Sequence, residues 1–230
     1  ILDGNLNERV YARDILHHIA NVYGAFPGKN LEWDGDAVAA MPMQGRFTLA
    51  TLSAELSAEF SLFRHDDILR KYLNGRASKG YEPVDPDPDA AYDEVIRIDI
   101  SRIEPLVVLP HKVAHNATEA NLLTETRIDQ AFIGSCANGR IEDFEVAAEI
   151  MSGRQVAPGV RMIVTPGSQK VLQEALAKGY VETLMSAGAV VTNSTCGACY
   201  GGHMGVLGDG EVCITASTRN FQGRMGSSEA

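Results

Sequence analysis

The 230-residue sequence has few cysteines, no long apolar run and an excess of acidic over basic residues. Its four cysteines are too few for a small secreted scaffold held together by disulfides. No apolar run reaches the roughly 18 residues that a membrane-spanning helix needs, and no secretory signal peptide is recognisable at the start. We therefore predict a soluble protein of the reducing cytoplasm, with no membrane partner.

Basic residues are scarce: 20 lysines and arginines stand against 30 aspartates and glutamates, a formal net charge of -10 at pH 7. A protein that binds nucleic acid without regard to sequence needs a basic surface, because neutralising phosphates releases counterions. The charge balance argues against a nucleic-acid partner. With 45% hydrophobic residues, the chain can bury the core of one large domain or of two ordinary ones.

The first half of the sequence predicts helices over residues 8–23 and 46–60, where apolar residues recur at helical spacing. Glu55 stands among apolar and small residues in the second of these stretches. An acidic side chain there is either at the wet edge of the helix or buried with a partner, and the pattern alone favours the exposed edge. The triplet 65–67 offers an N-cap to a short helix over 68–73.

Residues 77–93 hold three prolines and four aspartates, which favours an extended, solvated connection. Residues 95–100 alternate between apolar and polar side chains and predict a half-buried strand. From residue 127, short apolar strands alternate with helices, and parallel strands joined by right-handed helical crossovers are expected. The predicted strands are 131–134, 161–164 and 189–191, and the predicted helices are 141–151, 168–178 and 181–185.

Three cysteines follow these strands. Cys136 comes just after one strand, and Cys196 and Cys199, spaced C-x-x-C, come just after another. Ligands collect at the carboxyl ends of the strands in open α/β sheets, so sulfurs from the two loops can meet in one crevice. Three thiolates hold a 4Fe-4S cluster but leave one iron open, and an open iron is a Lewis acid. The pattern therefore predicts a catalytic iron–sulfur cluster.

Other uses of the cysteines remain open at this point. Cys136, Cys196, Cys199 and His203 are together a chemically sound ligand set for structural zinc. A dithiol redox pair is less favoured, because the two glycines that follow the C-x-x-C motif are a poor start for a helix. Cys213 lies in a strand-like run and is predicted to be a packed hydrophobe.

Two arginines, Arg219 and Arg224, lie five residues apart in a glycine-containing stretch close to the end of the chain. Guanidinium groups hold carboxylates through paired hydrogen bonds. Beside an open metal site they suit a substrate with two or more carboxylates. Ordinary surface salt bridges are the alternative for both residues.

Four segments of the chain resemble the aconitase superfamily: IGSCANGRIEDF, CGACYGGHMGVL, STRNFQGRMG and DPDPDAAYDEVIRIDISRIEPLVVLPH. Within the superfamily they look most similar to the large subunits of 3-isopropylmalate dehydratases, with homoaconitases and 2,3-dimethylmalate dehydratases as relatives. The resemblance implies an α/β fold, namely the three-layer α/β/α architecture with mostly parallel sheets. It implies two subdomains, residues 1–125 with a linker around 77–93, and residues 126–230 carrying the cluster.

The resemblance also implies a 4Fe-4S cluster held by Cys136, Cys196 and Cys199. Arg219 and Arg224 match the family's two substrate-carboxylate arginines in its RNFxGR motif. Glu55 matches an active-site glutamate in a helix of pattern AExGA, and this replaces the exposed-edge interpretation. The family reaction removes water from a 2-hydroxy di- or tricarboxylic acid such as 3-isopropylmalate and adds it back with the hydroxyl moved. A hydro-lyase of leucine biosynthesis is the expected activity.

The same resemblance predicts that the chain is a fragment. The family's N-terminal aspartate and histidine have no match here, and the base serine comes from a separate small subunit that carries a swivelling domain. We expect the chain to bind a cluster but to be inactive without these parts. Thr51 and Thr218 stand where the family usually has asparagines, and Ala137 replaces a threonine, which changes hydrogen bonding near the cluster. A non-catalytic zinc-bound or apo domain kept for assembly is the alternative.

Overall fold

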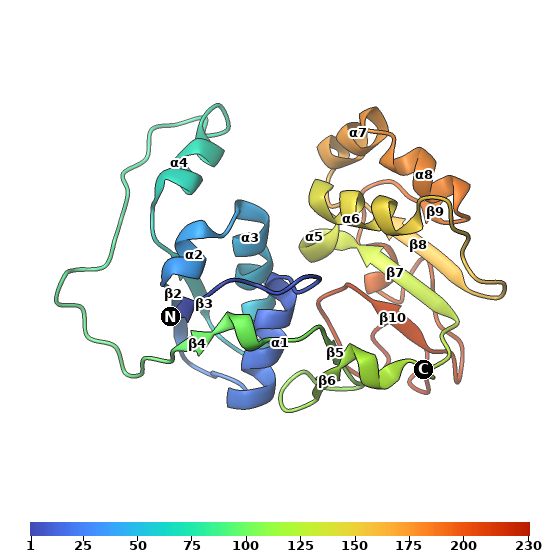
Figure 1. Ribbon diagram of the computed structural model, residues 1–230, viewed down its shortest axis with the longest axis horizontal. Coiled ribbons are helices and arrows are strands. Elements are labelled where there is room, and N and C mark those ends of the chain that lie inside the picture. Colours follow the sequence, from blue (N-terminus) through green and yellow to red (C-terminus); the bar gives the residue numbers. More distant parts are fainter. The chain divides into compact units, whose positions relative to one another are not determined.

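The computed structural model describes residues 1–230, and these residues form two compact units. The first unit comprises Ile1–Val108 and Val113–Leu122, and the second comprises Leu109–Lys112 and Leu123–Ala230. Figure 1 labels the elements of both. No helix in either unit combines the length and the apolar character needed to cross a membrane.

The first unit packs short helices around three small sheets (Figure 1). Strands β1 and β4 pair in parallel, as do β2 and β3, whereas β5 and β6 are antiparallel. The core includes apolar side chains of α1 and α3 that are at most 5% exposed, namely Ile15, Leu16, Ile19, Leu49 and Leu52. The elements are β1 (Leu2–Asp3), α1 (Ala12–Tyr23), β2 (Asn30–Trp33), α2 (Asp36–Ala40), α3 (Met43–Leu52), η1 (Ser53–Leu56), β3 (Phe60–Phe63), α4 (Asp67–Leu73), β4 (Ile98–Asp99), η2 (Ile100–Arg102), β5 (Leu106–Val108), β6 (Ala117–Glu119) and, across the boundary of the units, η3 (Ala120–Leu123).

The predicted helix over 46–60 is wrong beyond Leu52. The chain tightens there into the 3-10 helix η1, and Ser57 then adopts a left-handed conformation with φ of 58°. Residues 60–63 pair with β2 as the parallel strand β3, so tertiary pairing outweighs the helical spacing of their apolar side chains. Glu55 consequently lies in a 3-10 turn and not in an α-helix.

Other boundaries in this unit also differ from prediction. Helix α1 begins at Ala12, four residues later than predicted from the pattern. The strand expected over 95–100 is reduced to Ile98–Asp99, because the Asp99 carboxylate accepts a hydrogen bond from Ser101 N at 3.1 Å and opens the 3-10 helix η2. The strand β2 was not predicted.

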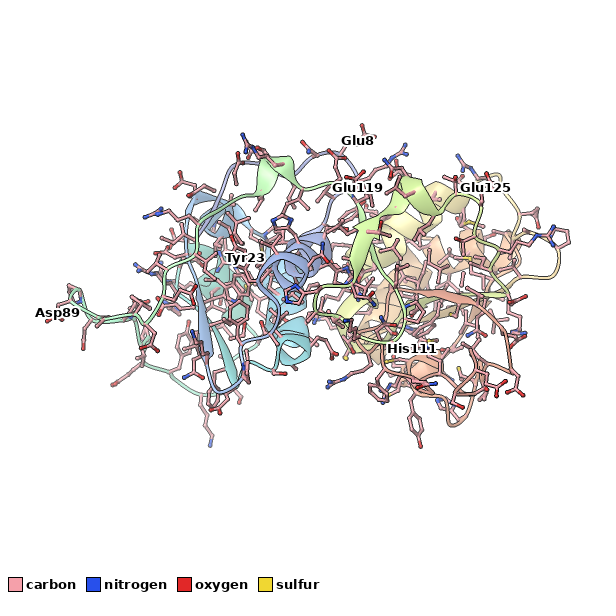
Figure 2. All side chains as sticks on the ribbon, turned by 90° about the horizontal axis from the view of Figure 1, so that it is seen from below. Glu8, Tyr23, Asp89, His111, Glu119 and Glu125 are labelled. Atoms are coloured by element: carbon pink, nitrogen blue, oxygen red, sulfur yellow. The ribbon has the colours of Figure 1, made fainter.

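The segment between α4 and β4 carries no helix or strand, and nearly all of its residues are exposed. Figure 2 shows Asp89 at the far end of this excursion of the chain from the first unit. The solvated connection predicted over 77–93 is confirmed. Its alternating prolines and aspartates neither donate a full set of backbone hydrogen bonds nor provide apolar surface to bury.

The second unit is an α/β unit with a four-stranded parallel sheet in the order β10-β7-β8-β9 (Figure 1). The α/β class with mostly parallel sheets is confirmed. The elements are β7 (Gln130–Gly134), α5 (Ser135–Asn138), α6 (Ile141–Met151), β8 (Arg161–Thr165), α7 (Gln169–Ala177), α8 (Tyr180–Ser186), β9 (Val190–Val191), η4 (Gly197–Cys199) and β10 (Cys213–Thr215).

Alternate side chains of the central strands serve two different cores. Met162 and Val164 of β8 pack with α6, α7 and α8 on one face of the sheet. Phe132 of β7 and Ile163 of β8 point to the other face, where they pack with Ala198 and Cys199 of η4 and with side chains of later, irregular segments. The C-x-x-C loop is therefore part of the core that covers this second face.

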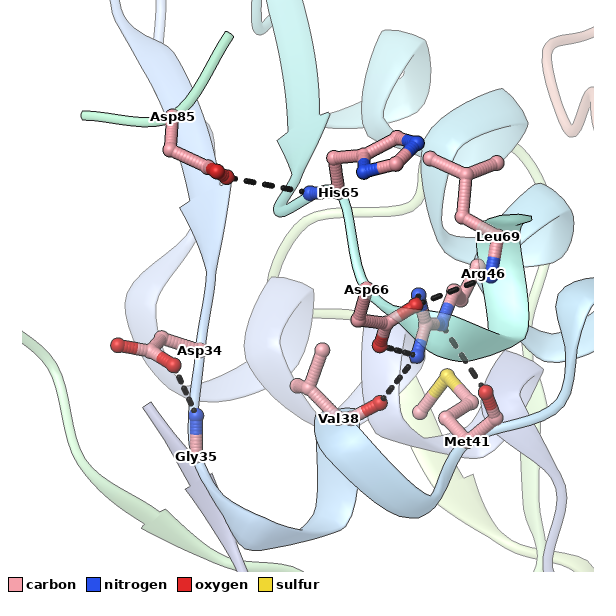
Figure 3. A network of polar contacts seen from close by, with 9 residues as sticks. All are labelled: Asp34, Gly35, Val38, Met41, Arg46, His65, Asp66, Leu69 and Asp85. Carbon is pink, nitrogen blue, oxygen red and sulfur yellow. Dashed lines mark hydrogen bonds and ion pairs between the residues drawn. The ribbon is translucent and has the colours of Figure 1, made fainter. Parts of the chain in front are cut away.

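A buried arginine ties α2, α3 and α4 of the first unit together (Figure 3). The Arg46 side chain is only 3% exposed, and it donates hydrogen bonds to the carbonyl oxygens of Met41 at 3.0 Å and Val38 at 3.1 Å. It also forms a two-pronged ion pair with Asp66, whose carboxylate caps α4 by accepting from Leu69 N at 3.0 Å. The capping predicted for the triplet 65–67 is confirmed.

Replacing Asp66 with asparagine should lower the free energy of unfolding, because Arg46 then stays buried without a counter-charge. We expect a loss of about 2 kcal/mol, below the value for a fully buried pair because part of the Asp66 side chain is exposed. Urea denaturation at pH 7 measures it. Asp67→Asn is the matched control. The Asp67 side chain is 76% exposed and forms an ion pair with Arg70, so its loss should change the free energy of unfolding by less than about 0.5 kcal/mol.

The same pair predicts a pH dependence. Hydrogen bonds from the Arg46 guanidinium hold the pKa of Asp66 below its usual value. A lowered carboxyl pKa stabilises the fold fully above the pKa of the unfolded chain, about 3.9, and this contribution is lost as the pH falls through the lower, folded-state pKa. The difference between wild type and Asp66→Asn should therefore shrink below about pH 4. A difference that stays constant from neutral pH into that range would contradict the assignment.

Candidate functional site

The carboxyl ends of the four parallel strands of the second unit lie at one edge of its sheet. Cys136 follows β7, Thr165 ends β8, Cys196 follows β9 and Arg219 follows β10. A cysteine, threonine or arginine therefore lies at or after the carboxyl end of each strand, at the same edge of the sheet. This is the place where ligands bind in open α/β sheets.

Residues 134–139, which include the short helix α5 and are called the Cys136 loop below, lie directly against the end of β8. A Cβ atom added to Gly134 would be 2.0 Å from the carbonyl oxygen of Thr165, and one added to Gly139 would be 2.6 Å from the same atom. Glycine is therefore required at both positions. Between them, Ser135 adopts φ of 66°, a left-handed conformation that costs a non-glycine residue roughly 1–2 kcal/mol. This turn leaves Cys136 exposed at the surface of the unit.

The C-x-x-C loop also lies against β8. Gly197 has φ of 56°, and a Cβ atom there would be 2.4 Å from Thr165 Oγ1 and 3.0 Å from the ring of Phe132. The short 3-10 turn closes with a hydrogen bond of 3.2 Å from Cys199 N to the carbonyl oxygen of Cys196. Cys199 is buried and Cys196 is exposed. Because Gly197 has no side chain, the short turn that carries Cys196 and Cys199 can lie directly against β8.

Thr165 is the residue that both cysteine loops contact. The Cys136 loop approaches its carbonyl oxygen through Gly139, and the C-x-x-C loop approaches its hydroxyl through Gly197. The hydroxyl is also within 2.9 Å of Thr192 Oγ1 in the loop after β9. Part of each cysteine loop therefore lies at the carboxyl end of β8. Thr165 itself was not predicted, although it ends a buried apolar strand just before Pro-Gly.

The residues at this edge fit a sulfur-rich cluster. All four cysteines are free thiols. The hydroxyls of Ser135 and Ser194 are buried beside the two cysteine loops and have no hydrogen-bond partner in the protein, so acceptor sulfurs placed between the loops could satisfy them. No group of three or more His, Cys, Asp or Glu side chains converges on a position for a single metal ion. A 4Fe-4S cluster differs in its demand, because each thiolate binds a separate iron.

Arg219 and Arg224 line one cavity of about 130 Å³ within the second unit. Asn220 and His111 line it too, and no aspartate or glutamate does. The Asn220 amide donates to the carbonyl oxygens of Leu109 at 2.6 Å and Lys112 at 3.3 Å, so it holds the segment that presents His111. The sequence analysis predicted the role of the two arginines but did not identify His111 as part of this cavity. Two arginine side chains and no acidic side chain therefore line the cavity.

Cys213 lies on the wall of the same cavity and starts β10. Burial raises the pKa of its thiol to about 11, and the Gln130 amide lies 3.7 Å from its sulfur. Cys213 is partly buried against the core that contains Phe132 and Cys199, which agrees with the prediction of a packed hydrophobe. The remaining candidate, Glu55, is half-buried and belongs to the first unit.

Comparison with known proteins gives consistent matches along the chain. The profile of the aconitase family (aconitate hydratase) matches residues 1–230. The 3-isopropylmalate dehydratase large subunit of Mycolicibacterium smegmatis is 50% identical over 229 residues, which cover 100% of this chain and 54% of the relative. The proteins of the same name from Aliarcobacter butzleri and Moorella thermoacetica are each 42% identical, over 95% and 99% of this chain and 53% and 54% of the relatives. The chain spans about half the length of the curated relatives it matches.

Gly197→Ala tests the packing of the C-x-x-C loop on β8. The added methyl group meets both Thr165 and Phe132, so we expect a loss of roughly 3 kcal/mol in the free energy of unfolding, from left-handed strain plus overpacking. Gly153→Ala is the matched control, because Gly153 has φ of 69° but nothing within 4 Å of an added Cβ. Its loss should be about 1 kcal/mol. Equal losses in urea denaturation would show that the loop does not pack as described.

Proposed function

Because the chain belongs to the aconitase family, we propose that it is the cluster-binding part of a hydro-lyase large subunit that acts on 2-hydroxy di- or tricarboxylic acids such as 3-isopropylmalate. One observation carries the proposal. The Cys136 loop and the C-x-x-C loop pack on the same residue, Thr165, in a unit whose arginine-lined cavity suits carboxylates. The names of the relatives support the choice of substrate class.

We assign the 4Fe-4S cluster to the thiolates of Cys136, Cys196 and Cys199. When bound, such a cluster supplies one iron without a protein thiolate, which acts as a Lewis acid toward the substrate hydroxyl. The protein's own part begins with two left-handed turns beside the cysteines, one at Ser135 and one at Gly197. A left-handed conformation costs free energy for a residue other than glycine, such as Ser135, and residues held in this way cluster at functional sites.

Arg219 and Arg224 are assigned to the carboxylates of the substrate. A guanidinium binds a carboxylate through two parallel hydrogen bonds, and so fixes its orientation as well as its position. No aspartate or glutamate side chain lines the cavity, so no acidic side chain of its wall would repel a bound carboxylate. Glu55 is assigned as an active-site carboxylate from its match to the family pattern. A carboxylate in that role can exchange a proton with the hydroxyl that leaves or returns.

We further propose a separate small subunit as partner, since each relative is named a large subunit. That partner, with its swivelling domain, is expected to bring the base serine. The chain alone would then hold a cluster without turning over substrate. A reducing compartment such as the cytoplasm would keep the three thiols available for iron.

Anaerobic reconstitution tests the cluster assignment. The chain should take up about four iron and about four sulfide ions. Serine in place of Cys136, Cys196 or Cys199 should abolish or sharply reduce the uptake, because each substitution removes a ligand. Cys213→Ser should retain it, and is the matched control. Stoichiometric zinc without sulfide, which the non-catalytic alternative predicts, would overturn the proposal, as would full iron and sulfide in the Cys136→Ser variant.

Arg219→Ala tests the carboxylate assignment in a complete large subunit assembled with its small subunit. Losing a two-pronged, charge-assisted contact of about 3 kcal/mol should reduce kcat/KM for 3-isopropylmalate roughly a hundredfold. Arg154→Ala, at an exposed position of the second unit, should leave kcat/KM unchanged. An Arg219→Ala enzyme with wild-type kcat/KM would contradict the assignment.

A further inference from the structure

The side chain of Arg224 is bound to the C-x-x-C loop. Its Nε donates a hydrogen bond to the carbonyl oxygen of Cys199 at 2.7 Å, and its Nη2 lies 3.8 Å from Cys199 Sγ, within reach of a hydrogen bond to sulfur. One guanidinium therefore contacts both the main chain and the thiol of a single cysteine. Two of its five N–H groups are used in this way, and the others stay available to a carboxylate in the cavity.

The surroundings of Arg224 hold this contact in place. Its guanidinium carbon lies 5.4 Å from the ring centre of Phe221 and 5.9 Å from that of Tyr200, within the range of cation–π attraction. Its carbonyl oxygen accepts a hydrogen bond from Gly201 N at 3.0 Å. A Cβ on Gly201 would be 2.4 Å from Gly226 N, so the segments around Arg224 and Cys199 are in close contact. Main chain and side chain of Arg224 thus both bind the segment 199–201.

Resting on the proposed function, we propose that the two arginines have different roles, because only Arg224 also acts on a cluster ligand. Arg224 is a positioning residue for Cys199, which it holds at the cluster and whose sulfur it contacts as a charged donor. Arg219, an exposed residue of the same cavity, serves the substrate alone. A hydrogen bond from a cation to a ligating sulfur favours the reduced, more negative form of a cluster, so it raises the reduction potential. It also slows loss of the ligand from iron.

Arg224→Gln and Arg219→Gln form the test pair, since both remove a charge from the same cavity wall. Each chain is reconstituted anaerobically with iron and sulfide and then exposed to a chelator of ferrous iron. We expect the visible absorbance of the Arg224→Gln protein to decay about tenfold faster than that of the wild type, in line with the usual cost of removing a group that orients a metal ligand. Its reduction potential, from a redox titration, should be more negative. Arg219→Gln should match the wild type in both.

Arg224→Lys is the second variant, in case Arg224→Gln fails to fold. Lysine keeps the charge but cannot reach the carbonyl oxygen and the sulfur with the paired geometry of a guanidinium. A folded Arg224→Lys protein, judged by circular dichroism and its urea midpoint, should lose its cluster faster than the wild type and slower than Arg224→Gln. A wild-type decay rate and potential in a folded Arg224 variant would overturn the inference.

The outcomes separate this inference from the function on which it rests. A wild-type chain that takes up no iron and sulfide refutes the proposed function. A stable wild-type cluster that is unaffected by Arg224→Gln refutes only the role of Arg224. Equal losses in the Arg219→Gln and Arg224→Gln proteins would refute the difference between their roles, because both arginines would then act on the cluster.

Discussion

The close approach of two loops to Thr165 is the constraint on which the site depends. Glycines at 134, 139 and 197 let the backbone of both loops approach this threonine, because a Cβ atom at any of the three positions would clash with it. Both loops lie at the carboxyl-end edge of the parallel sheet, and the glycines leave room for their backbones because they have no side chains. Cys136, Cys196 and Cys199 gain their positions from these turns.

Charge is distributed in the second unit in a way that the overall composition conceals. A chain with a net charge of -10 has a cavity lined by two arginines and by no acidic side chain. A bound polycarboxylate would therefore meet cations at the cavity and not the acidic residues that dominate elsewhere. Arg224 connects this cavity with Cys199. In the proposed site, Arg224 contacts both a bound carboxylate and the cluster ligand Cys199. A carboxylate that binds Arg224 would therefore affect the position of Cys199.

The sequence predicted what depends on period and strand order, and missed what depends on tertiary contact. The parallel α/β unit and the positions of Cys136 and Cys196 after its strands followed from short apolar runs alternating with helices. The end of α3 at Leu52 did not, because β3 forms only by pairing with β2. Thr165 and the contact of Arg224 with Cys199 were also missed, since neither residue type signals which backbone will approach it. Glu55 matched a family pattern while lying in a 3-10 turn.

We propose that three thiols from two loops hold a cluster with one iron open to substrate. A Mössbauer spectrum of the chain, reconstituted with Mössbauer-active iron, tests it most directly, because the method distinguishes iron sites by their ligands. We predict one iron that differs from the rest and that shifts when 3-isopropylmalate is added, while the thiolate-bound irons change little. Irons that are all equivalent and insensitive to the hydroxy acid would contradict the account.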